Sequence, residues 1–341
     1  MTHTTRASEG RAVRVKVAAT SVAALLFAIV LGVLLGTEPI DLGRLLHDPE
    51  SLDRVIVLDV RLPRVLLGVV AGAGLSIVGV ALQALLRNPL AEPFVLGVSG
   101  GSAVGATVAI LVGISGTTVL GAYVTPLFAM VGGLGATVLV HALAASAASG
   151  PESRGASVLL AGIVVNAIAS AAITFVKTLV SQAKAQELLF WLVGFLDVPS
   201  RATLVAMTVY VAVGGAVLLR DAARLNLLSL GNDAAEHLGV SVPALERRVY
   251  FASSLVVGAI VSVTGLIGFV GLIVPHALRR VVGPDARVTM PASMALGGAA
   301  LVLCDLVSRT AFRLLHREPP VGAITALVGG TLFLALLRKR A

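Results

Sequence analysis

Long runs of apolar residues, separated by short polar segments, dominate the chain. Windows that lack Asp, Glu, Lys and Arg recur, and each is close to the ~20 residues that a helix needs to cross about 30 Å of hydrocarbon. The clearest of these windows are 17–36, 65–86, 155–176, 202–219 and 319–337. The pattern therefore predicts an all-α, polytopic membrane protein.

Composition excludes the main alternative, a water-soluble domain. The 341 residues are 57% hydrophobic and only 13% charged, and the mean hydropathy is +0.97. A soluble domain of this size cannot bury so much apolar surface around one core. The first apolar run follows basic residues, as in a secretion signal, but its full span length and the lack of an A-x-A site favour an uncleaved helix.

Two uncharged regions need a decision on how many helices they hold. Residues 94–151 are too long for one helix, and several glycines and Pro126 offer turns, so we expect two spans there. Residues 249–278 are long for one helix and short for two. We divide them near 264–268, because only an even number of crossings fits the charges at the two ends of the chain.

Those charges are basic clusters at 6–16 and 338–340. Cationic residues collect on the cytoplasmic side of a membrane, so both termini are expected inside. Ten spans satisfy this rule, at roughly 17–36, 65–86, 94–112, 122–146, 155–176, 202–219, 249–264, 266–282, 288–308 and 320–337. The expected organisation is a cytoplasmic tail at 1–16 and one transmembrane domain at 17–341.

The charges of the loops agree with this orientation. The 37–60 loop is rich in Asp and Glu, which suits the outside, whereas the basic loops at 220–248 and 279–287 suit the inside. Residues 188–196, which read LLFWLVGFL, are too short to cross. We expect them to lie as a half-helix at the outer surface.

Several arginines oppose this charge bias. Arg61 and Arg64 stand at the outer start of the second span, and Arg309 stands near the outer end of the ninth. Asp305, four residues before Arg309 on the same helical face, is a ready partner for it. Arg61 and Arg64 place two guanidiniums at one rim, and such a fork suits the carboxylates of a partner protein.

Two segments that contain proline interrupt the apolar pattern and are expected to have structural or gating roles. The first is a rigid cytoplasmic turn formed by Asn88, Pro89, Glu92 and Pro93. The second places Pro275 and His276 in a short apolar run before a basic exit. We expect His276 to bond a backbone carbonyl that the proline leaves free, rather than to relay protons.

The long inner loop has a pattern of its own and is expected to dock a partner. Within 225–248 the sequence predicts a short amphipathic helix, capped by Asn232 and Asp233, and a second short helix after Pro243. Ala234, Ala235 and Leu238 would form its apolar side. The residues expected to carry the docking contact are Gly231, Asn232, Asp233, Ala235, Leu238 and Gly239.

An enzyme hypothesis rests on one motif. GVSGG at 97–101 matches G-x-S-x-G, a pattern that intramembrane serine proteases also use, with Ser99 as nucleophile and His141 as the available base. The motif is weak in a chain this rich in Gly and Ser. Six scattered histidines share no metal-ligand spacing, and a lone Cys304 allows no intrachain disulfide. We therefore expect neither catalytic nor metal-binding residues.

The chain also lacks an energy source of its own. No G-K-[S/T] occurs, so a P-loop for ATP is absent, and the centres of the predicted spans are nearly free of the ionisable residues that a secondary transporter needs. Energy for transport would have to come from another subunit, which could dock at the 225–248 loop.

A family resemblance is carried by six blocks in a fixed order. The blocks are RLPR, GVALQALLRNPLAEPFVLGVSGGSAVGA, WLVGFL, LGNDAAEHLGV, GFVGLIVPHALRR and EPPVGAITALVGGTLFLALL. They cover roughly residues 55–340 and resemble the FecCD family of ABC importer permeases, which includes vitamin B12, ferric-siderophore and haem permeases.

The resemblance implies a ten-helix subunit of type II ABC importer architecture that pairs with a second permease subunit, identical or closely related. The translocation path would lie between the two. Two cytoplasmic ABC ATPase subunits would use the ATP, and an extracytoplasmic substrate-binding protein would deliver the cargo. The chain would sit among the lipids of a bacterial plasma (inner) membrane and bind no cofactor and no nucleic acid.

The resemblance also assigns roles to residues. Arg61, Arg64 and Arg309 would meet acidic residues of the binding protein, and the helices in 229–246 would enter a groove on the ATPase. The sequence departs from the family at Asn232 and Asp233, where two Glu are usual, and at GPDAR (283–287), where many members have Asp-His-Arg. The implied mechanism is alternating access. A ferric siderophore leads as cargo because siderophore permeases are the most numerous members, with cobalamin or haem as alternatives.

Overall fold

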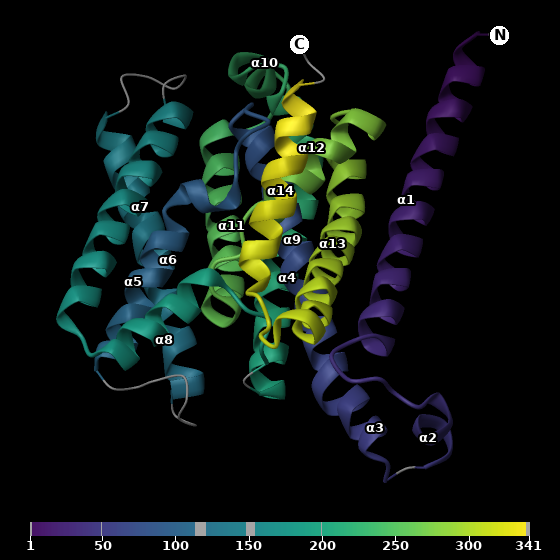
Figure 1. Cartoon of the computed structure of the whole chain (residues 1–341). Coiled ribbons are helices and arrows are strands. Elements are labelled where there is room, and N and C mark those ends of the chain that lie inside the picture. The colour runs from purple at the N-terminus through teal and green to yellow at the C-terminus, as the bar shows by residue number, and fades with distance from the viewer. Residues whose placement is uncertain (1, 49, 113–120, 148–153, 199, 339–341) are drawn as a thin grey trace.

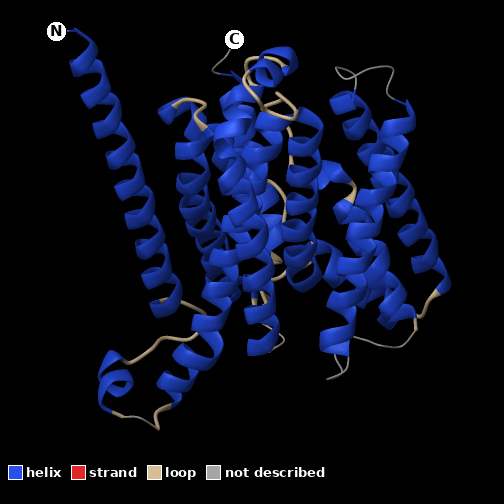
Figure 2. Ribbon diagram, turned by 180° about the vertical axis from the view of Figure 1, so that it is seen from behind, coloured by secondary structure: helices blue, strands red, loops and turns tan. Residues whose placement is uncertain are grey.

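A computed structural model describes residues 2–48, 50–112, 121–147, 154–198 and 200–338. Helices supply the regular structure of these residues, and no strand occurs among them (Figure 2). The all-α prediction is therefore confirmed. Lys339 and Arg340 of the C-terminal basic cluster lie outside the described residues.

Most of the long helices stand side by side along one direction (Figure 1). The long helices are α1 (Thr2–Leu34), α4 (Leu62–Leu85), α6 (Gly121–Ala147), α7 (Arg154–Leu179), α9 (Arg201–Leu228), α11 (Val242–Thr264), α13 (Ala286–Leu315) and α14 (Val321–Arg338). The shorter ones are α2 (Leu42–His47), α3 (Leu52–Val55), α5 (Val98–Leu111), α8 (Gln182–Val193), α10 (Asn232–His237) and α12 (Val270–Val282). The π-helical turn η1 (Ile56–Arg61) joins α3 to α4, and the 3₁₀ turn η2 (Pro93–Leu96) precedes α5.

Among the described residues, seven helical segments are long and apolar enough to cross a membrane. They are Arg14–Leu34, Leu52–Leu85, Val124–Ala147, Gly155–Leu179, Arg201–Leu228, Val242–Thr264 and Ala286–Leu315. Helices α5, α12 and α14 lie at the other three predicted segments, 94–112, 266–282 and 320–337. The chain is thus a multi-pass membrane protein.

The two ends of the bundle are named here by the helices that mark them, the α10 end and the α3 end. The start of α1 and the end of α14 both lie at the α10 end, whereas α2 and α3 project from the opposite end (Figure 1). An even number of crossings requires this arrangement.

Three local predictions can be compared with the helix boundaries. The division of 249–278 is confirmed, since α11 ends at Thr264 and α12 begins at Val270. The half-helix is confirmed in part as α8, which begins and ends earlier than expected, at Gln182 and Val193. The second short helix after Pro243 is wrong, because Pro243 occupies the first turn of α11, where its missing N–H costs nothing.

Small residues let the helices approach closely, as the glycine spacing predicts. A Cβ added at Gly72 of α4 would lie 2.2 Å from the carbonyl oxygen of Gly297 in α13. A Cβ at Gly101 of α5 would lie 2.3 Å from the carbonyl oxygen of Gly132 in α6. Helices in lipid associate through such close packing because no hydrophobic force drives them together there.

The short helix α5 is held at both ends by the segment that forms α7 and α8. Asn166 of α7 accepts a hydrogen bond from the Gly100 amide at 2.9 Å, near the start of α5, and donates one to the Phe94 carbonyl at 2.9 Å. Lys184 of α8 donates to the Leu111 carbonyl, the last residue of α5, at 3.1 Å. These contacts satisfy backbone groups that a helix end leaves free in a region without water.

Candidate functional site

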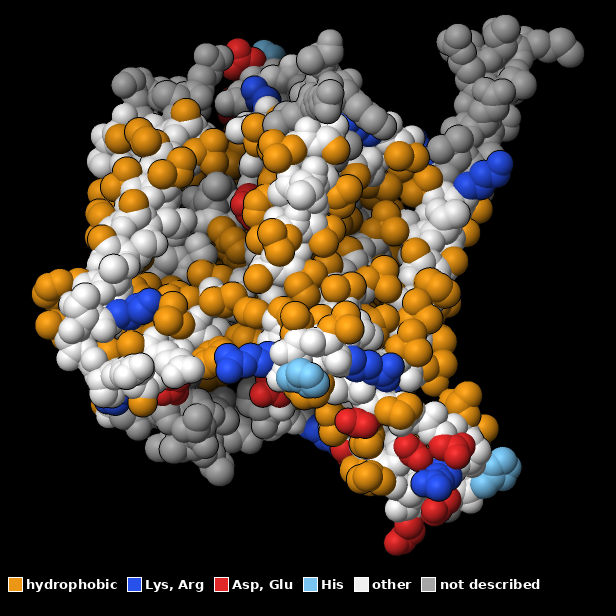
Figure 3. Space-filling model, viewed as in Figure 1, with side chains coloured by type: hydrophobic (Ala, Val, Ile, Leu, Met, Phe, Trp, Pro, Cys, Tyr) orange, Lys and Arg blue, Asp and Glu red, His pale blue; other side chains and the backbone are white. Residues whose placement is uncertain are grey.

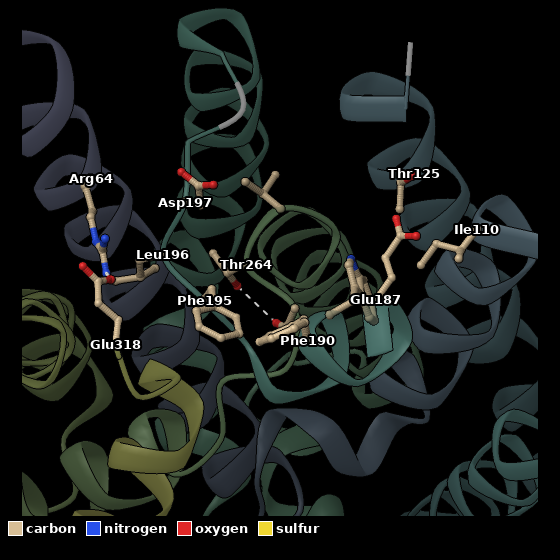
Figure 4. A pocket seen from close by; sticks show the side chains of 13 residues that line it. Arg64, Ile110, Thr125, Glu187, Phe190, Phe195, Leu196, Asp197, Thr264 and Glu318 are labelled. Carbon is tan, nitrogen blue, oxygen red and sulfur yellow. Dashed lines mark hydrogen bonds and ion pairs between the residues drawn. The ribbon is translucent and has the colours of Figure 1, made fainter. Parts of the chain in front are cut away.

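A cavity of about 540 Å³ lies near the α3 end of the bundle, between the start of α4 and the helix α8 (Figure 4). Its charged lining residues are Arg64, Glu187, Asp197 and Glu318, and its aromatic ones are Phe190, Trp191 and Phe195. Helix α8 supplies Glu187, Phe190 and Trp191, so the predicted half-helix forms one wall of the cavity.

The lining of this cavity carries more negative than positive charge. Three carboxylates and one guanidinium line it. The guanidinium of Arg64 is already engaged, because it pairs with Asp305 at 2.9 Å and with Glu318 at 3.1 Å. Asp197 is exposed. The cavity is therefore suited to a neutral or cationic molecule with an apolar surface that can contact the aromatic rings.

Asp305 anchors a buried charge cluster beside the cavity. Its side chain is 1% exposed and pairs with Arg309 at 2.9 Å, which confirms the predicted partnership along one face of α13. Arg64 approaches the same carboxylate from α4, with its Nε donating to Asp305 at 3.0 Å. One carboxylate thus joins α4 to α13 and pairs with the buried guanidinium of Arg309 and the partly buried guanidinium of Arg64.

Arg61 and Arg309 also hold the end of α1. The last carbonyls of that helix have no partners within it. Arg61 donates to the carbonyls of Val33 and Leu34, at 3.2 and 2.8 Å, and Arg309 donates to the carbonyl of Gly32 at 2.9 Å. Cationic groups are favourable at a helix C-terminus, so these bonds give Arg61 and Arg309 a structural role at the α3 end of the bundle.

This internal use changes what the arginines can offer to a partner. Arg61 is 5% exposed and Arg309 is 4% exposed, so neither presents an open guanidinium at the rim, and Arg64 is committed to Asp305 and Glu318. The docking role of these three residues stays a prediction. Exposed guanidiniums at this end include those of Arg44, Arg201, Arg313 and Arg317, and Figure 3 shows basic and acidic side chains gathered there.

Helix α10 projects from the opposite end of the bundle (Figure 1). The predicted caps are wrong: Gly231 is the N-cap residue, with φ of +117°, and the side-chain oxygen of Asn232 accepts a hydrogen bond from Arg87 instead. Gly239 ends the segment as predicted, with φ of +83°. Only glycine adopts such backbone angles without strain.

The faces of α10 differ from the predicted pattern in one respect. Ala235 is fully buried, whereas Leu238 is 57% exposed and does not share its side of the helix. The exposed residues of the segment are Asp233, Glu236, His237, Leu238 and Gly239. A short helix with one buried alanine and an exposed leucine among charged residues offers a surface to a partner while staying fixed to the bundle.

The proline-rich turn reaches far into the structure. The side chain of Asn88 accepts a hydrogen bond from the Leu90 amide at 2.9 Å and holds the turn that leads to Pro89, Pro93 and η2. Glu92 accepts one at 2.9 Å from the amide of Phe269, a residue with φ of +69° just before α12. Burial raises the pKa of Glu92, and the bond from Phe269 opposes that rise only in part.

This contact ties the first interruption of the sequence to the second. Glu92 holds the break between α11 and α12, and Pro275 and His276 lie buried in the middle of α12. The two proline-containing segments therefore belong to one structural unit, which the sequence alone did not predict.

The structure contradicts the protease hypothesis. The hydroxyl of Ser99 is buried and bonds to the side-chain oxygen of Asn166 at 3.3 Å. His141 packs instead on Tyr250, with ring centroids 4.4 Å apart, and lines a different cavity with Glu246 and Arg247. A nucleophile needs its base within hydrogen-bond reach, and no such contact exists here. Within the described ranges no cluster of three His, Cys, Asp or Glu residues could hold a metal ion either.

Sequence reasoning missed a second buried carboxylate. Asp221 of α9 accepts two hydrogen bonds from Arg248 of α11, at 2.8 and 3.1 Å, and also pairs with Arg224. The spacing of Asp221 and Arg224 on one helical face was a readable signal. The bond to Arg248 could not be predicted, because it joins α9 to α11, and the α10 segment separates these two helices in the sequence.

Comparison with known proteins places these features in a family. The model of the FecCD transport family matches residues 24–339. The cobalamin import system permease protein BtuC of Halobacterium salinarum is 43% identical over 86% of this chain and 75% of its own length. The hemin transport system permease protein HmuU of Yersinia pestis is 36% identical over 84% of each chain. Further relatives are named for molybdate and Fe(3+)-citrate import.

A solved structure supports the same placement. An inward-facing structure described as a metal-chelate type ABC transporter has a TM-score of 0.83 and 31% sequence identity, and the match covers 95% of this chain and 99% of that one. The resemblance read from the six sequence blocks is confirmed.

Proposed function

The chain belongs to the FecCD transport family and is a permease subunit of an ABC importer, and from this premise we propose that it passes a neutral or cationic metal chelate through the plasma membrane. The observation that carries the proposal is the cavity at the α3 end, with its surplus of carboxylates and its aromatic wall. A corrinoid such as cobalamin fits this description first, and a cationic siderophore second.

Electrostatics separates the candidate cargoes. A carboxylate-rich lining repels oxyanions and polyanionic chelates, since like charges in a partly desolvated site cost free energy. This argues against molybdate and ferric citrate, which relatives are named for, and leaves cobalamin and uncharged or cationic siderophores. The 43% identity to a cobalamin permease favours the corrinoid. Siderophore permeases are the most numerous members of the family, so neutral or cationic ferric siderophores stay candidates.

Four partners complete the proposed transporter. A second permease subunit would pair with this chain, and a substrate-binding protein would load the cavity from the α3 end. Two ABC ATPase subunits would bind the exposed surface of α10. The α10 end would face the cytoplasm, because basic residues such as Arg87, Arg220 and Arg280 collect there.

The proposed mechanism is alternating access driven from the α10 end. Nucleotide binding would move the ATPase pair, and α10 would pass that motion to α9 and to the end of α4 through the Arg87–Asn232 contact. The chain would bind no cofactor, and no covalent step is needed. The switch would change which end of the path is open.

Uptake by a strain from which the gene has been deleted tests the proposed cargo. We expect uptake of radiolabelled cyanocobalamin, or of a ferric hydroxamate siderophore, to be lost and to return with the wild-type gene. Molybdate uptake should not change. A gene that carries Asp197→Lys should restore uptake poorly, because this change reverses one charge of the cavity lining. A gene that carries Glu50→Lys should restore uptake fully, because Glu50 is exposed and lies outside the cavity. Loss confined to molybdate would contradict the proposal.

A further inference from the structure

A second cavity, of about 480 Å³, lies at the α10 end, where the ends of α4, α9 and α12 meet the start of α13. Its charged lining residues are Arg87, Arg279, Arg287 and Asp285, and we call it the arginine cavity. Three guanidiniums against one carboxylate leave a surplus of two positive charges. This is the reverse of the cavity at the α3 end.

The single carboxylate is already used. Asp285 caps α13 by accepting a hydrogen bond from the Arg287 amide at 3.1 Å, and it pairs with the Arg287 side chain through two bonds of 3.1 Å. Asn226 donates to it at 2.6 Å. The hydrogen bonds from Arg287 hold the pKa of Asp285 below its usual value, so it is ionised at neutral pH. Asp285 therefore neutralises Arg287 and has no charge to spare for the other two arginines.

Arg279 and Arg87 have no acidic partner among the described residues. Arg279 donates to the Val80 carbonyl at 2.9 Å, and its Nε is buried without a hydrogen-bond partner there. Arg87 donates to the Leu228 carbonyl at 3.2 Å and to the side chain of Asn232. Uncompensated guanidiniums in a partly buried cavity cost free energy, and a bound anion would remove that cost.

We propose that the arginine cavity binds a phosphate-bearing anion, either the headgroup of an anionic phospholipid or free phosphate. Guanidinium groups bind phosphate oxygens through paired hydrogen bonds, and basic pockets between transmembrane helices are a usual site for anionic headgroups. The cavity is large enough for a headgroup and lies where spans end. Because Arg87 also holds Asn232 at the start of α10, the anion would stabilise the helix that faces the proposed ATPase partner.

Thermal unfolding of the purified full chain tests the proposal without any partner protein. The chain would be placed in nanodiscs of phosphatidylcholine, with and without added phosphatidylglycerol, and separately titrated with inorganic phosphate at constant ionic strength. We expect an anionic ligand to raise Tm, while additional phosphatidylcholine leaves it unchanged. A rise with phosphatidylglycerol alone assigns the site to lipid, and a rise with inorganic phosphate assigns it to free phosphate. No rise with either anion would overturn the proposal.

Variants connect the effect to the cavity. Arg279→Gln should weaken binding by about tenfold or more, as expected for losing hydrogen bonds to a charged group. Arg280→Gln is the matched control, because it removes the same charge next to the cavity without lining it. Ser229→Glu serves if Arg279→Gln does not fold, since Ser229 lines the cavity, is exposed and would place a competing carboxylate beside the arginines. Equal affinity in the wild type, Arg279→Gln and Ser229→Glu would contradict the assignment.

Discussion

Arg309 is held by two kinds of contact at once, the free carbonyl of Gly32 in α1 and the buried carboxylate of Asp305. Replacing Arg309 with Gln should lower the free energy of unfolding by about 3 kcal/mol, because one member of a buried ion pair is removed and its partners lose their bonds. The measurement is thermal or denaturant unfolding in detergent.

Arg317→Gln is the control for this change, because Arg317 is exposed near the same end of the bundle. Exposed charges contribute little to stability. If the two variants unfolded at the same temperature, Arg309 would not have the structural role described here, and a docking role would gain support.

Glu92 predicts a specific dependence of stability on pH. Its pKa is raised above the ordinary value of 4.5 by burial, so the folded state binds the proton more tightly than the unfolded state. The stability gained from the protonated form is fully present below the unfolded pKa and is lost as the pH rises through the folded pKa. The difference in Tm between the wild type and Glu92→Gln should therefore shift against the wild type as the pH is raised above 4.5.

Glu92→Gln isolates the charge because the amide oxygen can still accept the bond from Phe269. A Tm difference that stayed constant from acidic to neutral pH would show that Glu92 does not change its charge in that range.

At the scale of single residues, what could be predicted depended on sequence distance. The pair of Asp305 and Arg309 was readable because four residues separate them on one helix. The acceptors of Arg61 were not, since they are carbonyls of α1 and the sequence does not show where α1 ends in space. A sequence does not distinguish an arginine that caps a distant helix from an arginine that is available to bind a partner protein.

Helix α10 gives the clearest prediction for a whole element. Leu238→Glu should leave the fold unchanged, because Leu238 is largely exposed, yet it should uncouple ATP hydrolysis from uptake by placing a charge in the proposed ATPase contact. Leu238→Met should retain coupling. The measurement is the ratio of ATP hydrolysed to cargo taken up by the assembled transporter.

Ala235→Leu should behave differently, because Ala235 is fully buried and a larger side chain there is overpacked. We expect a lower Tm for this variant before any effect on coupling. If Leu238→Glu retained normal coupling, α10 would not be part of the proposed ATPase interface.

The elements themselves were predicted well where hydrophobic length decided and less well where contacts decided. Each of the ten predicted segments contains a helix, and the break after Thr264 lies where apolar length and charge parity placed it. The faces of α10 did not follow, because six residues are too few to define a stripe and the helix is oriented by the loop glycines and by Arg87. The hydrogen bonds that hold both ends of α5 could not be predicted either, because Asn166 and Lys184 come from other helices that only the fold brings close to α5.

The whole molecule combines a carboxylate-rich cavity at one end with an arginine-rich cavity at the other. Neither cavity could be predicted, because each collects residues from at least three helices. The lack of a P-loop can be read directly from the sequence. It supports the central claim that the chain forms the transport path but does not supply the energy for transport. Its transport would be driven by a nucleotide-hydrolysing partner at the α10 end.

Reconstitution into proteoliposomes tests that claim most directly. Vesicles would contain this permease alone, or the permease with its ATPase and binding protein, and uptake of radiolabelled cyanocobalamin against a gradient would be measured with and without ATP. The account predicts accumulation only in the complete assembly supplied with ATP. Accumulation against the gradient by the permease alone would contradict it.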